Sequence, residues 1–200
     1  MYVNLRRYPS IGAEHGVIEQ SVIEELLPEF RQQAGFRGYH AFWDDEGAGV
    51  SVSVFDDPED AHRSTDAARR WVMRHQEFFP QRGEEFSGDC FAHAEAPGLA
   101  RGWAPWILVR LLSGVPRSQD TRAFVEQRTL PMITRAAGFR AVLMLRHDRD
   151  ASRAAVVTLF DRREQAEASH ARAIELLAEG LPQVRVDRVI QGLSAIHGGR

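Results

Sequence analysis

Two residues in the first half of the sequence stand at a spacing that suits chemistry on a flat organic molecule. Trp71 and His75 are four residues apart, so on a helix they share one face. An imidazole titrates near neutral pH and can accept a proton, and an indole can stack against an aromatic ring. The pair therefore suggests one side of a pocket for a planar ligand.

Two further polar residues are expected on strands. Asn4 belongs to a predicted strand over residues 2–8, where its amide could hold a developing oxyanion. His40, on a strand predicted over residues 36–43, is a second candidate base. Its neighbour Tyr39 has the opposite strand parity, so at most one of these two faces a pocket.

Each of the four candidate catalytic residues also has a structural interpretation. A buried Trp most often belongs to the core, and a single inward His most often hydrogen-bonds a backbone carbonyl. Asn is a poor strand former that is commonly held by local hydrogen bonds. The candidate set, for which both interpretations stay open, is His75, Trp71, Asn4 and His40.

An internal repeat indicates which elements must position these residues. Several landmarks recur in the same order, 103 to 105 residues later. They are Leu27-Pro28 and Leu130-Pro131, Ala34–Arg37 and Ala137–Arg140, Val54–Asp56 and Leu159–Asp161, and Gly88 and His93 with Gly192 and His197. The chain is therefore predicted to be two copies of one module, residues 1–96 and 104–197, joined by a turn-rich linker.

Each copy is predicted to follow the order β-α-β-β-α-β. The first copy has apolar helical spacing from Ile18 to Ala34, with Gly35 as a left-handed cap, and a second helix from Asp57-Pro58 to about Phe79. Its other predicted strands are residues 36–43, 50–56 and 86–94. The second copy is predicted to have strands 106–112, 139–146, 154–161 and 184–196, with helices 120–137 and 163–179.

The strand predicted over residues 154–161 is apolar on both faces, so each face needs a cover. Helices can cover one face, and the sheet of the sister copy is the obvious cover for the other. The predicted fold class is α+β, with two tandem ferredoxin-like (βαββαβ) modules packed sheet to sheet.

The two copies differ at the candidate residues. Apolar residues or glycine stand in the second copy at these places: Leu176 and Gly180 for Trp71 and His75, Leu108 for Asn4, and Val142 and Leu143 for Tyr39 and His40. Burying polar groups costs free energy unless they are hydrogen-bonded. The first copy is therefore expected to keep a pocket, and the second to be mainly structural.

Composition excludes several classes of function. A net charge of −3, with scattered basic residues, argues against a nucleic-acid binder. The absence of lysine excludes Schiff-base chemistry, and one cysteine excludes a disulfide framework. The eight histidines lack the spacing of a metal site. No run reaches the roughly 18 apolar residues of a membrane span, and no signal peptide is evident, so we expect a cytoplasmic protein.

The element order and a few landmarks resemble a known superfamily. The landmarks are Leu27-Pro28 late in the first helix, Gly35-Phe36-Arg37 at the helix-to-strand junction, and Phe55-Asp56 at the end of the third strand. They resemble the dimeric α/β-barrel superfamily, most closely its antibiotic-biosynthesis-monooxygenase-like (ABM-like) branch. That superfamily usually pairs two subunits sheet to sheet. The resemblance implies an intramolecular dimeric α/β barrel, present as a monomeric pseudo-dimer or as a homodimer of it.

The resemblance also implies a small-molecule pocket in each module, but it does not fix the reaction. One hypothesis is a cofactor-independent monooxygenase-like oxidoreductase acting on a planar aromatic substrate, with His75 or His40 as the base. A second is a non-catalytic ligand-binding or stress-response module. The third is a haem-binding or haem-degrading protein, for which Asn4 and His75 are suitably placed. Relatives of that kind carry their Trp earlier in the helix, near Ser64, and Trp71 departs from that pattern.

Overall fold

The computed structural model describes residues 1–97 and 104–199, so the predicted linker lies largely outside the described residues. The described parts form two compact units. The first unit is Met1–Asp89 together with the C-terminal residues from Ser194 on, and the second is Cys90–Leu193. The last strand of each predicted module therefore begins in one unit and ends in the other.

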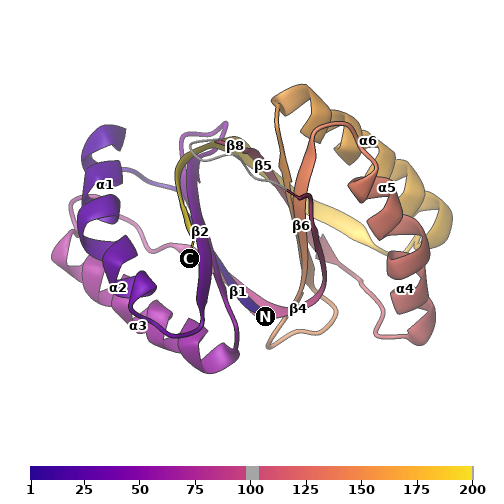
Figure 1. Ribbon diagram of the computed structural model, residues 1–200, viewed down its shortest axis with the longest axis horizontal. Coiled ribbons are helices and arrows are strands. Elements are labelled where there is room, and N and C mark those ends of the chain that lie inside the picture. Colours follow the sequence, from indigo (N-terminus) through magenta and orange to yellow (C-terminus); the bar gives the residue numbers. More distant parts are fainter. Residues whose placement is uncertain (98–103, 200) are drawn as a thin grey trace. The chain divides into compact units, whose positions relative to one another are not determined.

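The first unit is a sheet covered on one face by helices. The sheet has the order β4-β1-β3-β2-β8, and all its pairings are antiparallel. In Figure 1 the helices of this unit lie together on one side of β2. Its elements are β1 (Tyr2–Tyr8), α1 (His15–Ser21), a π-helical segment (Val22–Leu26), α2 (Leu27–Arg31), β2 (Phe36–Trp43), β3 (Gly49–Phe55), α3 (Pro58–Arg74) and the start of β4 (Glu84–Glu95).

The second unit repeats this plan. Its elements are β5 (Trp106–Ser113), α4 (Gln119–Phe124), a π-helical segment (Val125–Thr129), α5 (Leu130–Thr134), β6 (Phe139–His147), β7 (Ala154–Phe160), α6 (Arg163–Gly180) and most of β8 (Arg185–Gly199). Its strands follow the order β8-β5-β7-β6-β4. The eight strands together have the closed antiparallel order of a barrel, β1-β3-β2-β8-β5-β7-β6-β4, so the fold is α+β. Among the described residues no helix is both long and apolar enough to cross a membrane.

A π-helical segment precedes the Leu-Pro pair in both units. The amide of Leu27 donates to the carbonyl of Val22, and that of Leu130 donates to Val125, five residues back in each case. The following proline has no N–H and cannot continue the α-helical pattern, which favours the wider turn. The repeat seen in the sequence is thus present in an irregular local structure as well.

The ends of three predicted helices are wrong. The helix predicted over 120–137 ends at Thr134. The first helix ends at Arg31 and not at Ala34, and Gly35 is not among the residues with positive φ in the described parts of the chain. Glycine fits there because a Cβ would lie 2.0 Å from the Asp60 carboxylate, so any other residue would force the buried Asp60 side chain to shift. Helix α3 ends at Arg74 and not near Phe79, because the two phenylalanines that precede Pro80 fold back into the core.

Other local predictions are confirmed. The side chain of Asp57 caps α3 by accepting from the Asp60 amide at 2.9 Å, with Pro58 in the first helical turn.

The helix-facing side of the first sheet holds an aromatic core that includes Phe30, Phe36 and Phe55. Alternate residues on the opposite face, such as Val3 and Val52, are buried too.

The β2–β3 turn depends on one buried ion pair. The carboxylate of Asp44 accepts from Arg7 Nε at 2.8 Å and from the amides of Glu46 and Ala48 at 2.9 and 2.8 Å. We expect Asp44→Ala to lower the free energy of unfolding by about 3 kcal/mol, because it removes the buried carboxylate partner of Arg7, leaving the exposed Glu46 and Glu84, and strips two turn amides of their acceptor. Urea denaturation measures this, with Asp45→Ala on the exposed side of the turn as control. Equal stability of the two variants would contradict the assignment.

Candidate functional site

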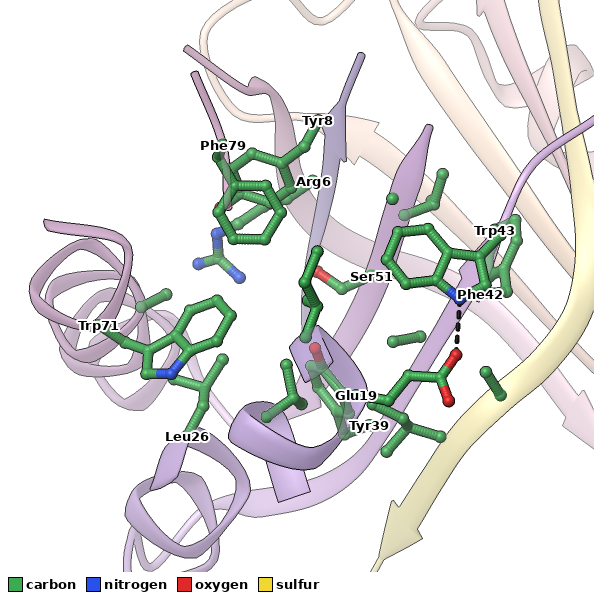
Figure 2. Close-up of a pocket in the computed structure, with 18 of the residues that line it drawn as sticks. Arg6, Tyr8, Glu19, Leu26, Tyr39, Phe42, Trp43, Ser51, Trp71 and Phe79 are labelled. Atoms are coloured by element: carbon green, nitrogen blue, oxygen red, sulfur yellow. Dashed lines mark hydrogen bonds between the residues drawn. The ribbon is translucent and has the colours of Figure 1, made fainter. Parts of the chain in front are cut away.

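A cavity of about 50 Å³ lies in the first unit, between the helix-facing side of its sheet and the helices. Figure 2 shows the side chains around it. They come from every layer of the unit: Arg6 and Tyr8 on β1, Glu19 on α1, Tyr39 and Trp43 on β2, Ser51 on β3, Trp71 on α3, and Phe79 after α3. This volume holds a few water molecules, because one water needs on the order of 10–15 Å³.

Aromatic rings form much of the cavity wall. The Phe79 ring lies 4.3 Å from that of Tyr8 and 5.7 Å from that of Trp71, measured between centroids. Tyr39 contacts Phe30 edge to face, with centroids 5.7 Å apart. Such rings favour a flat aromatic ligand, since stacked and edge-on ring contacts contribute beyond simple area burial.

A buried cation faces these rings. The Arg6 residue is 4% exposed, and its guanidinium donates to Thr65 Oγ1 at 2.7 Å and to Ser53 Oγ at 3.5 Å. Figure 2 shows it extending between Phe79 and Trp71. Within the described part of the chain no carboxylate is paired with it. Hydroxyl partners bring no negative charge to balance a guanidinium, so the cavity is suited to an anion.

The phenol of Tyr39 adds a neutral hydrogen-bond donor. Burial raises the pKa of Tyr39 above its ordinary value, and this outweighs the opposing effects of Arg6 and of its hydrogen bond with Ser51. The group therefore stays protonated at neutral pH. A protonated phenol beside a cation can donate to a ligand oxygen.

One carboxylate, Glu19, lines the cavity and connects α1 to the end of β2. It accepts a hydrogen bond from Trp43 Nε1 at 2.6 Å, drawn as a dashed line in Figure 2. The His15 ring stacks on one face of the Trp43 ring, with centroids 3.7 Å apart. These three residues, which we call the α1–β2 clasp, close this part of the cavity.

Trp71 is held by a hydrogen-bonded network. Its indole Nε1 donates to Ser21 Oγ at 3.1 Å, and Ser21 in turn donates to Glu25 Oε1 at 2.9 Å. His75 Nε2 lies 3.0 Å from Glu25 Oε2 and 3.3 Å from Ser21 Oγ. The hydrogen bonds from His75 and then Ser21 lower the pKa of the Glu25 carboxyl. The network fixes the tilt of the indole ring against the cavity.

The structure brings one of the four sequence candidates to the cavity wall. Trp71 lines it, whereas His75 lies behind the indole, after the end of α3, and stacks on Phe78 at 4.7 Å. Asn4 is 1% exposed and donates to the Ala61 carbonyl at 3.0 Å, so it ties α3 to β1. A catalytic role for any of them stays a prediction.

His40 lies on the face of β2 opposite the cavity, and Tyr39 faces it. The Nδ1 atom of His40 is 3.5 Å from Ser194 Oγ, and the cross-strand neighbour of His40 is His197. Burial, together with the charge of His197, lowers the pKa of His40 to about 4. The imidazole is therefore neutral at physiological pH.

Sequence reasoning missed Arg6, Glu19 and Tyr39 as a group. The available signal was strand parity, because Arg6 is two residues after Asn4 on the same face of β1. An arginine in a half-polar strand is ordinarily placed at the surface, which is why the signal carried little weight.

The residues at the cavity do not fit a haem held by His75. None of the residues lining it is a histidine or cysteine, and the His75 imidazole is turned toward Glu25 and Ser21. Among described residues no three His, Cys, Asp or Glu side chains gather as a metal site.

Comparisons with known proteins agree on the fold. Neither a protein-family model nor a curated protein matches the sequence. Solved structures match its whole length. A "putative monooxygenase" of Fusobacterium nucleatum has a TM-score of 0.76 at 9% identity, covering 100% of this chain and 94% of that one. A "putative monooxygenase" of Lactobacillus acidophilus has 0.72 at 7%, covering 99% and 95%.

A third structure, an "anthrone oxidase-like protein", has a TM-score of 0.65 at 11% identity, covering 99% of this chain and 92% of that one. At such identities the likeness establishes the fold and leaves the reaction open. These likenesses confirm the expected α+β fold.

The Trp71 network gives a stability prediction. Ser21→Ala removes the acceptor of a buried indole N–H, so we expect the free energy of unfolding to fall by about 1–3 kcal/mol. Urea denaturation followed by tryptophan emission measures it. Ser87→Ala, which removes a half-buried hydroxyl on β4, is the matched control. No difference between the two variants would show that the network does not hold the indole.

His40 gives a prediction about acid stability. Its folded pKa of about 4 lies below the unfolded value of about 6.5, so the unfolded chain binds more protons between these pH values. Stability should therefore fall as pH is lowered through this window, by about 2 kcal/mol for this half-buried group. Urea midpoints at pH 7, 5.5 and 4 should fall less in His40→Leu than in the parent chain. Exposed His93→Gln should behave as the parent, and identical slopes in all three would contradict this account.

Proposed function

We propose that the first unit binds a planar aromatic molecule with an acidic C–H or O–H group and oxidises it with O₂, as a cofactor-independent monooxygenase-like oxidoreductase. The observation that carries the proposal is the buried guanidinium of Arg6 at an aromatic-walled cavity, where hydroxyls are its partners and no carboxylate is paired with it in the described chain. The anion of such a substrate would supply the missing negative charge.

Each lining group has a role in this proposal. Trp71, Tyr8 and Phe79 stack against the rings of the substrate. Arg6 stabilises the negative charge that develops when the substrate loses a proton, and the Tyr39 phenol donates to the same oxygen. Glu19, the acidic side chain at the wall, accepts the proton. His75 acts as a positioning residue, because it reaches the cavity through Ser21 and Trp71.

The reaction balances without an external reductant. For a tricyclic anthrone, the ring CH₂ loses a proton and the resulting carbanion passes one electron to O₂. The two radicals combine to form a C–O bond, and the peroxide then loses one water molecule to leave a carbonyl group. One substrate and one O₂ give one quinone and one H₂O. The protein supplies charge stabilisation and a proton acceptor.

The size of the cavity requires it to open. A site for a drug-sized ligand is on the order of 300–1,000 Å³, well above the volume found here. The α1–β2 clasp of His15, Glu19 and Trp43 is the part of the wall that depends on one hydrogen bond and one ring stack. We propose that release of this clasp admits the substrate and frees Glu19 to accept a proton.

The small cavity also favours a second candidate function, a ligand-binding module without catalysis. A cavity of about 50 Å³ suits a small ligand better than a three-ring substrate. In that case aromatic acids would bind at Arg6, and no oxygen would be consumed. The experiment below separates the two candidates.

We further propose that the chain consists of two fused ferredoxin-like modules packed sheet to sheet, which makes it an intramolecular pseudo-dimer. The π-helical turn before each Leu-Pro pair supports a duplication. Residues on strand faces turned away from the helices are buried in both units, for example Val3 and Val157, each 0% exposed, which supports such packing.

Oxygen uptake tests the activity. With a hydroxylated anthrone we expect uptake above the uncatalysed rate, and Arg6→Met should reduce it about 100-fold, as loss of one charge-stabilising donor does elsewhere. Arg70→Met, which removes an exposed arginine from the outer face of α3, is the matched control and should keep full activity. Trp71→Phe should raise KM.

Two outcomes would decide against the enzyme. Uptake that is unchanged in Arg6→Met would remove the role of the cation. Absence of uptake with anthrones and quinols, combined with Arg6-dependent quenching of tryptophan emission by an aromatic acid, would leave the binding module as the function.

A further inference from the structure

The second unit contains a cavity of its own, also of about 50 Å³. It lies between the helix-facing side of β5, β6 and β7 and the helices of that unit. Its wall is mainly aliphatic and includes Leu112, Val125, Ile133, Met144, Val156 and Leu181. An apolar space of this kind needs no polar group for its stability.

Arg110 nevertheless extends into this cavity from β5. The residue is 2% exposed, and both its Nη1 and Nη2 atoms are buried without a hydrogen-bond partner. Burial alone lowers the pKa of Arg110 to about 10, so the group is still charged at neutral pH. An uncompensated buried charge costs several kcal/mol, and native proteins ordinarily pair it.

The corresponding arginine of the first unit shows what is missing. Asn4 aligns with Leu108, so Arg6 aligns with Arg110 two residues further along. Arg6 donates to Thr65 and Ser53. In the second unit His170 stands at the position of Thr65, and Thr158, at the position of Ser53, donates to the Leu108 carbonyl.

Two more polar atoms near Arg110 lack partners. Thr129 Oγ1 lines the same cavity and is buried without a hydrogen bond. His170 Nδ1 is also buried and unpartnered, and the pKa of His170 is lowered by burial and then by the charge of Arg110. A hydroxyl and a guanidinium of two residues that line one cavity can together bind a ligand with two acceptor oxygens.

We propose that the cavity of the second unit is a binding site for a small aliphatic monocarboxylate, with its carboxylate on Arg110 and its alkyl chain among the aliphatic side chains. A carboxylate matches the two-pronged geometry of a guanidinium and cancels a single positive charge. Thr129 donates to the same carboxylate. Phosphate would bring more charge than one arginine balances, and the aliphatic wall would leave its outer oxygens without donors.

Phe91 marks the route of entry. It lines the cavity and is 37% exposed, so its ring separates the cavity from solvent. The guanidinium of Arg146 lies over this ring, 5.4 Å from its centroid. A second cation at the entrance favours the approach of an anion.

Methionine methyl resonances test the proposal directly. Met144 lines the cavity and is 1% exposed, whereas Met73 is 69% exposed and belongs to the first unit. In protein with ¹³C-labelled methionine methyl groups, sodium hexanoate should shift the Met144 signal saturably and leave Met73 in place. The neutral analogue 1-hexanol should bind at least about ten-fold more weakly than hexanoate, because it lacks the charged hydrogen bonds. Ionic strength is held constant with NaCl.

Variants identify the cation. Arg110→Leu should remove the preference for hexanoate over hexanol, and Arg110→Lys should keep part of it. Arg6→Leu, the matched change in the first unit, should leave the Met144 titration unchanged. Without ligand, Arg110→Leu should unfold at a higher temperature than the parent chain, because it removes an unpaired buried charge. Hexanoate should raise the unfolding temperature of the parent and not of this variant.

Several results would overturn the proposal. Equal binding of hexanoate and hexanol would show that the site is an apolar cavity with no preference for a carboxylate. An unchanged hexanoate affinity in Arg110→Leu would place the carboxylate elsewhere. A Met144 shift of the same size with inorganic phosphate would show that the site binds anions in general and is not specific for an aliphatic carboxylate. If Arg110→Leu fails to fold, Arg110→Lys and the parent chain still decide between hexanoate and hexanol.

Discussion

Each unit buries an arginine between its sheet and its helices, and the partners of that cation decide what the adjoining cavity can hold. A guanidinium taken out of water must regain its hydrogen bonds or remain a cost to the fold. Arg6 recovers two of them from Thr65 and Ser53. The two Nη atoms of Arg110 recover none from the described protein. An anionic ligand is therefore a physical complement to both cavities, and more so in the second unit.

The cavity of the first unit depends on how α3 and α1 are fixed to the sheet and to each other. Asn4 fixes α3 to β1 through the Ala61 carbonyl, and the Trp71 indole fixes it to α1 through Ser21. Asn4 and Trp71, which were catalytic candidates in the sequence, thus also make the hydrogen bonds that fix the walls of the cavity in place. Their polarity and burial therefore have a structural cause, and a catalytic role for them stays a prediction.

Periodicity and the internal repeat were sufficient to predict the elements and their order, because strand parity and helical spacing are local signals. Helix ends were not, because contacts between distant residues decide them. Gly35 suits the close approach of Asp60, and α3 stops where Phe78 and Phe79 enter the core ahead of Pro80. His75 follows this early stop, and its imidazole lies against Glu25. Arg6 was overlooked because an arginine gives no local sign that its head group is buried.

The two copies differ in residue type at the candidate positions, but both carry an arginine at the same place, Arg6 and Arg110. What differs between these two arginines is the set of side chains around them. Aromatic rings and a phenol around Arg6 suit an anion whose charge is spread over several rings, and such an anion needs only part of a guanidinium already shared with two hydroxyls. Aliphatic side chains around Arg110 suit an anion whose charge sits on two oxygens, because both Nη atoms of Arg110 are buried without a hydrogen-bond partner in the described protein. A buried arginine at the same strand position of each unit can therefore suit two different ligand chemistries, which differ through the residues that flank it.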